Sequence, residues 1–147
     1  MADARVTEAA VVRFLHHFEE VALREDFDLL EDMIDERAYV RFNDGDHVGR
    51  AAVRAAFEKT WRGDPTVVKA AFYLSDIVVL TTDVASATAT YTYVWEGAQG
   101  DQRFRIQGRG TRVLAFDGED FRIVHEHLSA FPSPVGRAGA DQAGATS

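Results

Sequence analysis

The chain has 147 residues, 46% of them hydrophobic and 27% charged, which fits one globular domain with a single core. Its formal net charge of −8 argues against a general nucleic-acid partner. The absence of cysteine excludes disulfides and thiolate chemistry. The sequence shows no apolar run of about 18 residues and no secretory signal, so we expect a cytoplasmic protein with no membrane partner.

The first half of the chain predicts three helices and one strand. Apolar residues recur at three- and four-residue steps over residues 7–24, with Thr7 as the N-cap of an amphipathic helix. A shorter helix capped by Asp26 follows, and then a strand over residues 37–42 and a turn over residues 43–46. The third helix covers residues 51–61 and ends at a glycine and a proline.

The second half changes to a period of two, which predicts four strands over residues 67–80, 84–95, 103–116 and 121–131. Helices followed by such a meander predict an α+β fold. In this fold, three N-terminal helices cover a curved antiparallel sheet and close it into a cone. We expect residues 1–131 to form this domain and residues 132–147 to form a disordered tail.

Four stretches of the sequence resemble the SnoaL-like branch of the nuclear transport factor 2-like superfamily. They are DFDLL at 26–30, VGRAAV at 48–53, GTRV at 110–113 and FRIVHEHLS at 121–129, the last of which is similar to the closing strand of the family. The resemblance covers about residues 8–131 and implies a cystatin-like α+β roll with a pocket inside its sheet. It also implies homodimers, and pockets that host isomerases, dehydratases, cyclases, hydrolases or plain binding proteins. The reaction therefore stays open.

The last two strands decide which side chains face the pocket. A tight turn over residues 117–120 predicts that Arg112 lies opposite His125 and that Gly110 lies opposite His127. This register collects the large apolar groups and the glycines on one face, which we expect to line the pocket. A slip of one residue would move every side chain to the other face.

In this register His125, His127 and Arg112 are the candidate catalytic residues. A histidine titrates near neutral pH and can act as a general acid or base. A buried arginine can hold an oxyanion through two donors. The alternative is that both histidines are structural and hydrogen-bonded within the sheet.

Aromatic side chains are the candidates for binding a flat ligand. We expect those of the strand to lie beside Gly108 and Gly110, where the missing side chains leave room for rings. The alternative is that all of them belong to an ordinary core. The six candidates are Tyr91, Tyr93 and Trp95 on the strand and Phe14, Phe18 and Trp61 on the helices.

The sequence has neither the spacing of metal ligands nor a phosphate-binding loop, so we expect no metal and no cofactor. The expected partners are a small-molecule ligand and a second copy of the chain.

Two functions fit these residues. The first is an isomerase, dehydratase or cyclase that acts on a small hydrophobic or aromatic acid, with histidine as acid and base and Arg112 on the oxyanion. The second is a non-catalytic ligand-binding or dimerisation domain, similar to the association domain of calcium/calmodulin-dependent kinases.

Comparison with the steroid isomerases of the superfamily gives the second function equal weight. The resemblance places their base near Phe42 and their helical tyrosine near Phe18, and neither phenylalanine can transfer a proton. We therefore expect no buried carboxylate base at that place.

Overall fold

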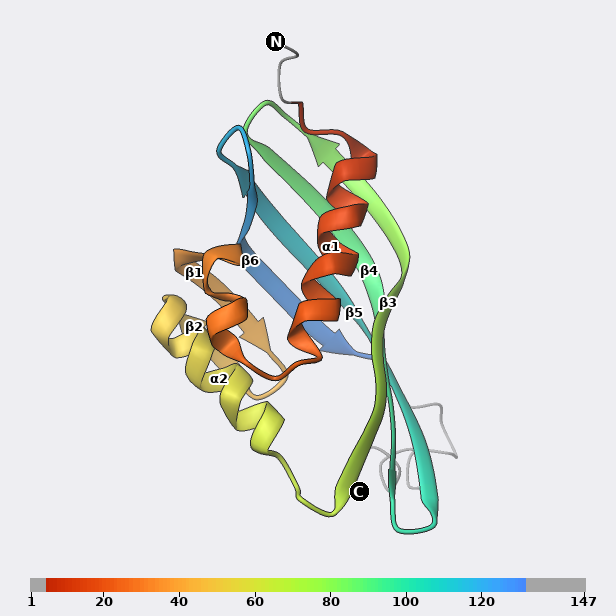
Figure 1. The fold of residues 1–147 in the computed structure, drawn as a ribbon. Coiled ribbons are helices and arrows are strands. Elements are labelled where there is room, and N and C mark those ends of the chain that lie inside the picture. Colours follow the sequence, from red (N-terminus) through yellow and green to blue (C-terminus); the bar gives the residue numbers. More distant parts are fainter. Residues whose placement is uncertain (1–4, 132–147) are drawn as a thin grey trace.

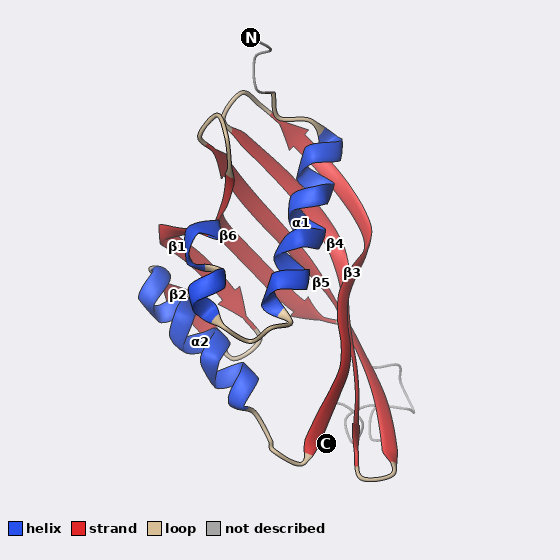
Figure 2. Ribbon diagram, viewed as in Figure 1, coloured by secondary structure: helices blue, strands red, loops and turns tan. Residues whose placement is uncertain are grey.

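The computed structural model describes residues 5–131 and shows helices on one face of a six-stranded sheet (Figures 1 and 2). The strands lie side by side in the order β2-β1-β6-β5-β4-β3. None of the helices in the described residues is long and apolar enough to cross a membrane. In chain order the elements are α1 (Glu8–Ala22), the 3₁₀ turns η1 (Phe27–Leu29) and η2 (Glu31–Met33), β1 (Ile34–Phe42), β2 (Gly45–Val48), α2 (Arg50–Arg62), β3 (Val67–Thr82), β4 (Ser86–Gln99), β5 (Gln102–Phe116) and β6 (Phe121–Ala130).

Helix α1 forms where the apolar stripe predicts it. The Thr7 hydroxyl accepts a hydrogen bond from the N–H of Ala10 at 3.1 Å, so Thr7 is the N-cap. Val11, Leu15 and Phe18 follow at helical spacing and are fully buried in the core. Burial of this stripe holds α1 on the face of the sheet that we call the inner face (Figure 1).

The prediction of three helices is wrong, because the described chain has two α-helices. Asp26 does cap the segment that follows and accepts a hydrogen bond from the N–H of Asp28 at 3.1 Å. The chain then makes only 3₁₀ turns, since β1 already begins at Ile34 and leaves too few residues for an α-helix.

The sheet is mixed rather than antiparallel. Strand β1 pairs with β6 in parallel, although every other pairing is antiparallel within the described residues. The turn expected over residues 43–46 overlaps the start of β2, an unpredicted strand that forms a hairpin with β1. The predicted tail over residues 132–147 lies outside the described residues.

Strands β4 and β5 pair in the expected way. Tyr93 lies opposite Gly108, and Tyr91 lies opposite Gly110. A Cβ atom at Gly108 would lie 2.2 Å from the ring of Tyr93, and one at Gly110 would lie 2.3 Å from the ring of Tyr91. The two glycines therefore leave the space that the tyrosine rings occupy on the inner face.

Strands β5 and β6 begin their pairing in the expected register and then depart from it. Leu114 lies opposite Ile123, as the turn predicts, but the next pair joins Val113 to His125. Val124 is therefore an extra residue without a partner in β5, which is a β-bulge.

The bulge at Val124 reverses the faces that the sequence predicts for the rest of β6. Arg112 lies opposite Glu126 rather than His125, and His127 lies opposite Thr111. Glu126 consequently points to the inner face, and both histidines point to the other face of the sheet, which we call the outer face.

We expect Gly108→Ala to lower the free energy of unfolding by about 1–3 kcal/mol, because its methyl group would overlap the Tyr93 ring. Replacing Tyr93 with leucine in the same chain should remove most of that cost. Urea unfolding of both single variants and the double variant measures the coupling. An equal cost of Gly108→Ala with and without the tyrosine would contradict this contact.

Candidate functional site

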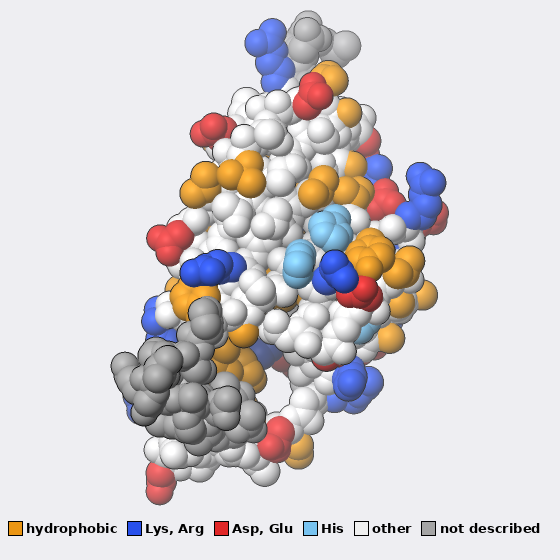
Figure 3. All heavy atoms as spheres, turned by 180° about the vertical axis from the view of Figure 1, so that it is seen from behind, with side chains coloured by type: hydrophobic (Ala, Val, Ile, Leu, Met, Phe, Trp, Pro, Cys, Tyr) orange, Lys and Arg blue, Asp and Glu red, His pale blue; other side chains and the backbone are white. Residues whose placement is uncertain are grey.

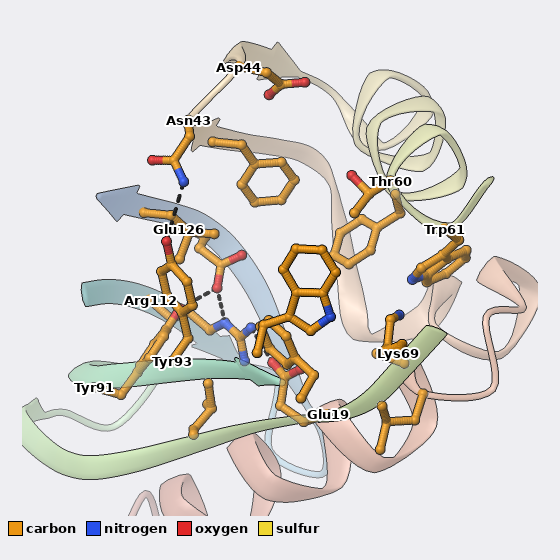
Figure 4. Close-up of a pocket in the computed structure, with 18 residues that line it drawn as sticks. Glu19, Asn43, Asp44, Thr60, Trp61, Lys69, Tyr91, Tyr93, Arg112 and Glu126 are labelled. Atoms are coloured by element: carbon orange, nitrogen blue, oxygen red, sulfur yellow. Dashed lines mark hydrogen bonds and ion pairs between the residues drawn. The ribbon is translucent and has the colours of Figure 1, made fainter. Parts of the chain in front are cut away.

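A cavity of about 380 Å³ lies between the inner face of the sheet, the end of α1 and helix α2 (Figure 4). This volume is within the range of small-molecule sites, about 300–1,000 Å³. Most of its wall is apolar and seven of its 18 lining residues are aromatic, so it suits a flat apolar molecule. The aromatic lining residues are Phe42, Phe57, Trp61, Phe72, Tyr91, Tyr93 and Trp95.

One end of the cavity is polar and is built around Arg112, whose side chain is only 4% exposed. Its Nε donates a hydrogen bond to Oε2 of Glu126, and its Nη2 donates one to Oε1 of Glu19. The hydroxyl of Tyr91 donates to the same Oε2 of Glu126 (Figure 4). The guanidinium also lies 4.8 Å from the ring centroid of Phe18. We call Arg112, Glu126, Glu19 and Tyr91 the buried network.

Local structure brings each charged member of the network to the cavity. Arg112 pairs with Ala89, whose small side chain leaves room for the guanidinium. Glu126 lies beside Val40 of β1, on the buried side of that strand. Glu19 follows Leu15 by four residues on α1, so it shares the buried stripe of the helix.

Burial sets the protonation states in the network. Desolvation raises the pKa of Glu19 despite the attraction of Arg112, and the nearby charge of Glu126 raises it further. Burial alone would lower the pKa of Arg112, but Glu126, Tyr91 and Glu19 outweigh it and raise that pKa well above its usual value. Desolvation also raises the pKa of Tyr91 well above its usual value, so its hydroxyl remains a donor.

Several side-chain atoms of the lining residues are without a hydrogen-bond partner among residues 5–131. Oε1 of Glu126 is an acceptor, because both hydrogen bonds to this carboxylate go to Oε2, and Figure 4 shows the carboxylate turned toward the cavity. Two others are buried donors, Nη1 of Arg112 and Nε1 of Trp95. The residues that line the cavity thus carry a carboxylate acceptor and two buried donors that no protein group satisfies.

Most of the predicted ligand-binding residues lie at the cavity. Phe18 instead packs in the core beneath Arg112, and Phe14 packs against the same core without lining the cavity. The predicted site residues that do line it are Arg112, Tyr91, Tyr93, Trp95 and Trp61.

His125 and His127 are not among the lining residues, so the prediction that they face the pocket beside Arg112 is wrong. Nδ1 of His125 lies 2.7 Å from the carbonyl oxygen of Tyr39, a hydrogen bond within the sheet. His127 is exposed on the outer face. Figure 3 shows imidazoles near the middle of that face, away from the helices.

Neither carboxylate of the network was predicted from the sequence. Glu19 has a visible signal, since it falls on the same helical stripe as Leu15 and Phe18. Glu126 has no such signal, because regular alternation along β6 would place it on the outer face. The bulge at Val124 turns it to the inner face. The expectation of no buried carboxylate base concerns the place of Phe42 and does not cover β6, where Glu126 is buried.

The comparisons with known proteins agree with this fold. The sequence profile of the SnoaL-like domain matches residues 11–134. The chain belongs to the SnoaL-like domain family. No curated protein matches it at a significant level.

Solved structures with the same fold show that this SnoaL-like domain has an α+β architecture of the nuclear transport factor 2-like type. The association domain of CaMKII from C. elegans is 16% identical, with a TM-score of 0.70, over 84% of this chain and 95% of that one. A proposed scytalone dehydratase from Novosphingobium aromaticivorans is 14% identical, with a TM-score of 0.69, over 88% and 93%. A nuclear transport factor 2-like superfamily protein from Salmonella enterica is 18% identical, with a TM-score of 0.68, over 87% and 94%.

The raised pKa of Glu19 predicts a pH-dependent stability. A carboxyl group whose pKa is raised by folding loses stabilising free energy as the pH rises above its ordinary value of 4.5. Glu19→Gln stays neutral and lacks this loss, so we expect its stability relative to the wild type to improve from acid to neutral pH. Urea unfolding across this pH range measures the difference. The matched control is Glu20→Gln at the exposed next position, which should show no such trend. Decreasing relative stability of Glu19→Gln with rising pH would contradict the assignment.

Proposed function

We propose that this SnoaL-like domain binds a small, flat, largely apolar carbonyl compound in the cavity and moves a proton on it, as isomerases and dehydratases do. The observation that carries the proposal is the free carboxylate oxygen of Glu126 at an aromatic cavity of ligand size. A positioned carboxylate is a general base when it reaches the proton to be transferred.

The network supplies each part of a proton transfer. Oε1 of Glu126 takes a proton from the carbon next to the carbonyl group, and the electron pair moves onto the carbonyl oxygen. Arg112 supports the resulting enolate with its positive charge and its free Nη1 donor. Return of the proton to a different carbon completes an isomerisation.

A dehydration uses the same base and adds an acid. The hydroxyl group on the neighbouring carbon leaves with the proton of Glu19 as water, and the proton taken by Glu126 restores Glu19. Burial supports this role, because it raises the pKa of Glu19 and so favours the protonated acid.

The charge of the network favours a neutral ligand over the carboxylic acid that was predicted as the ligand from the sequence. Arg112 is paired with Glu126 and Glu19, so its positive charge is already balanced inside the protein. A ligand carboxylate next to Glu126 would add a repulsive charge in a buried site. We therefore propose a ketone or a related neutral compound.

Exchange of the protons next to a ketone tests the function directly. With β-tetralone as the probe in deuterated water, we expect the wild-type protein to accelerate exchange and Glu126→Gln to reduce this acceleration by about a hundredfold or more. NMR follows the loss of the proton signal. The control is Glu96→Gln, at a partly exposed carboxylate of β4 that does not line the cavity. Equal catalysis by the wild type and Glu126→Gln would contradict the role of the base.

The similarity to an association domain supports a second function, binding without catalysis. The same experiment separates the two. A binding protein would bind β-tetralone by calorimetry and would leave its exchange rate at the value of the buffer.

We also propose a homodimer that forms through the outer face. Strand β3 exposes apolar side chains on this face, with relative exposures of 68% for Val68, 38% for Tyr73 and 52% for Val78. Burial of such a row against a second copy would stabilise a dimer.

The oligomeric state tests this surface. We expect Val78→Glu to shift the protein toward the monomer, because it places a charge among the apolar side chains of the interface. Analytical ultracentrifugation measures the mass in solution. Val84→Glu, at an exposed position between β3 and β4, is the matched control and should leave the mass unchanged. A wild-type protein that sediments as a monomer would exclude the dimer.

A further inference from the structure

The two buried side-chain atoms that are without a partner among residues 5–131 share one chemical character. Both Nη1 of Arg112 and Nε1 of Trp95 are hydrogen-bond donors, and both belong to residues that line the cavity. Buried polar groups in folded proteins are nearly always hydrogen-bonded, and a donor that is left unpaired costs free energy. Two such donors at one cavity point to a ligand that brings acceptors.

Trp95 is held in place by its surroundings. It follows Tyr91 and Tyr93 on the inner face of β4, opposite Ile106 of β5. Its ring meets the ring of Phe104 edge to face, with centroids 5.0 Å apart and an interplanar angle of 72°. An indole that packs in this way keeps its N–H in one direction, so the donor is already oriented before a ligand binds.

We propose that the indole N–H of Trp95 determines ligand specificity by binding an acceptor oxygen of the ligand. This oxygen is a second one, separate from the carbonyl oxygen at Arg112. The ligand class is therefore a flat ring system with acceptor oxygens at two positions. Carbonyl and ether oxygens meet this requirement, because they accept a hydrogen bond and bring no donor of their own into the apolar wall.

This inference shares one premise with the proposed function, namely that the ligand binds in this cavity. It does not require Glu126 to act as a base, since Trp95 would select the ligand in an enzyme and in a binding protein alike. Stacking alone, which the sequence predicts for Trp95, would use the ring and not the N–H. The two roles can be separated by a variant that keeps an aromatic ring and removes the donor.

The test uses two flat probes of similar size, α-naphthoquinone with two acceptor oxygens and naphthalene with none. The chain has no cysteine, so the quinone meets no thiol to which it could add. Calorimetry gives the dissociation constant of each probe for the wild type, Trp95→Phe and the control Trp61→Phe. Trp61 lines the same cavity and has no buried unpaired nitrogen.

We expect the wild type to bind the quinone more tightly than naphthalene. Trp95→Phe should reduce this preference by about tenfold, the effect of one hydrogen bond, and should change naphthalene binding little. Trp61→Phe should leave the preference unchanged. Far-ultraviolet circular dichroism confirms that each variant is folded.

The outcomes separate this inference from the proposed function. A preference that is equal in the wild type and Trp95→Phe would overturn the role of the indole, whatever Glu126 does. Loss of the preference in Trp95→Phe together with unchanged proton exchange in Glu126→Gln would uphold this role and overturn the acid–base function. Failure of both probes to bind the wild type would overturn the specificity proposal.

Discussion

The positive charge of Arg112 in the wall of an apolar cavity is the constraint around which the site is organised. A guanidinium that is withdrawn from water costs a large desolvation free energy unless carboxylates and further hydrogen bonds compensate for it. Glu126 from β6 and Glu19 from α1 supply this compensation, and Tyr91 from β4 completes it. The network therefore ties the first helix to three neighbouring strands at the point where the cavity is polar.

The same constraint also holds the Glu126 carboxylate in the orientation that the proposed proton transfer requires. A carboxylate whose one oxygen is occupied by two donors is fixed in orientation, and its other oxygen is available to a ligand. Groups that are oriented before the ligand arrives need little reorganisation during a reaction. The charged side chains are buried, which strengthens each electrostatic interaction at the site. The stability of the fold and the proposed function thus depend on the same buried charges.

The sequence predicts the parts of the fold that follow from local rules. The stripe of α1, its Thr7 cap and the four long strands are visible as periodicity and capping chemistry. The register of β4 against β5 is also predictable, because the glycines of one strand must receive the tyrosines of the other. The position of Tyr91, Tyr93 and Trp95 at the cavity follows from that register.

The rest depends on interactions that no local pattern reports. The bulge at Val124 is one extra residue in a strand that otherwise alternates regularly, and it exchanges the faces of the histidines and Glu126. The parallel pairing of β1 with β6 joins segments from opposite ends of the chain. The short segment after Asp26 has helical residues, but the start of β1 limits it to 3₁₀ turns. The predicted histidines therefore lie on the outer face, and two carboxylates take the place beside Arg112 that was expected for them.

Carbon NMR of protein labelled at the glutamate carboxyl and histidine imidazole carbons tests the central claim most directly, that the carboxylates and not the imidazoles meet the ligand. With saturating β-tetralone, the carboxyl signals of Glu126 and Glu19 should shift, and the imidazole signals of His125 and His127 should not. Shifted imidazole signals with unchanged carboxyl signals would contradict the bulged register and the site built on it.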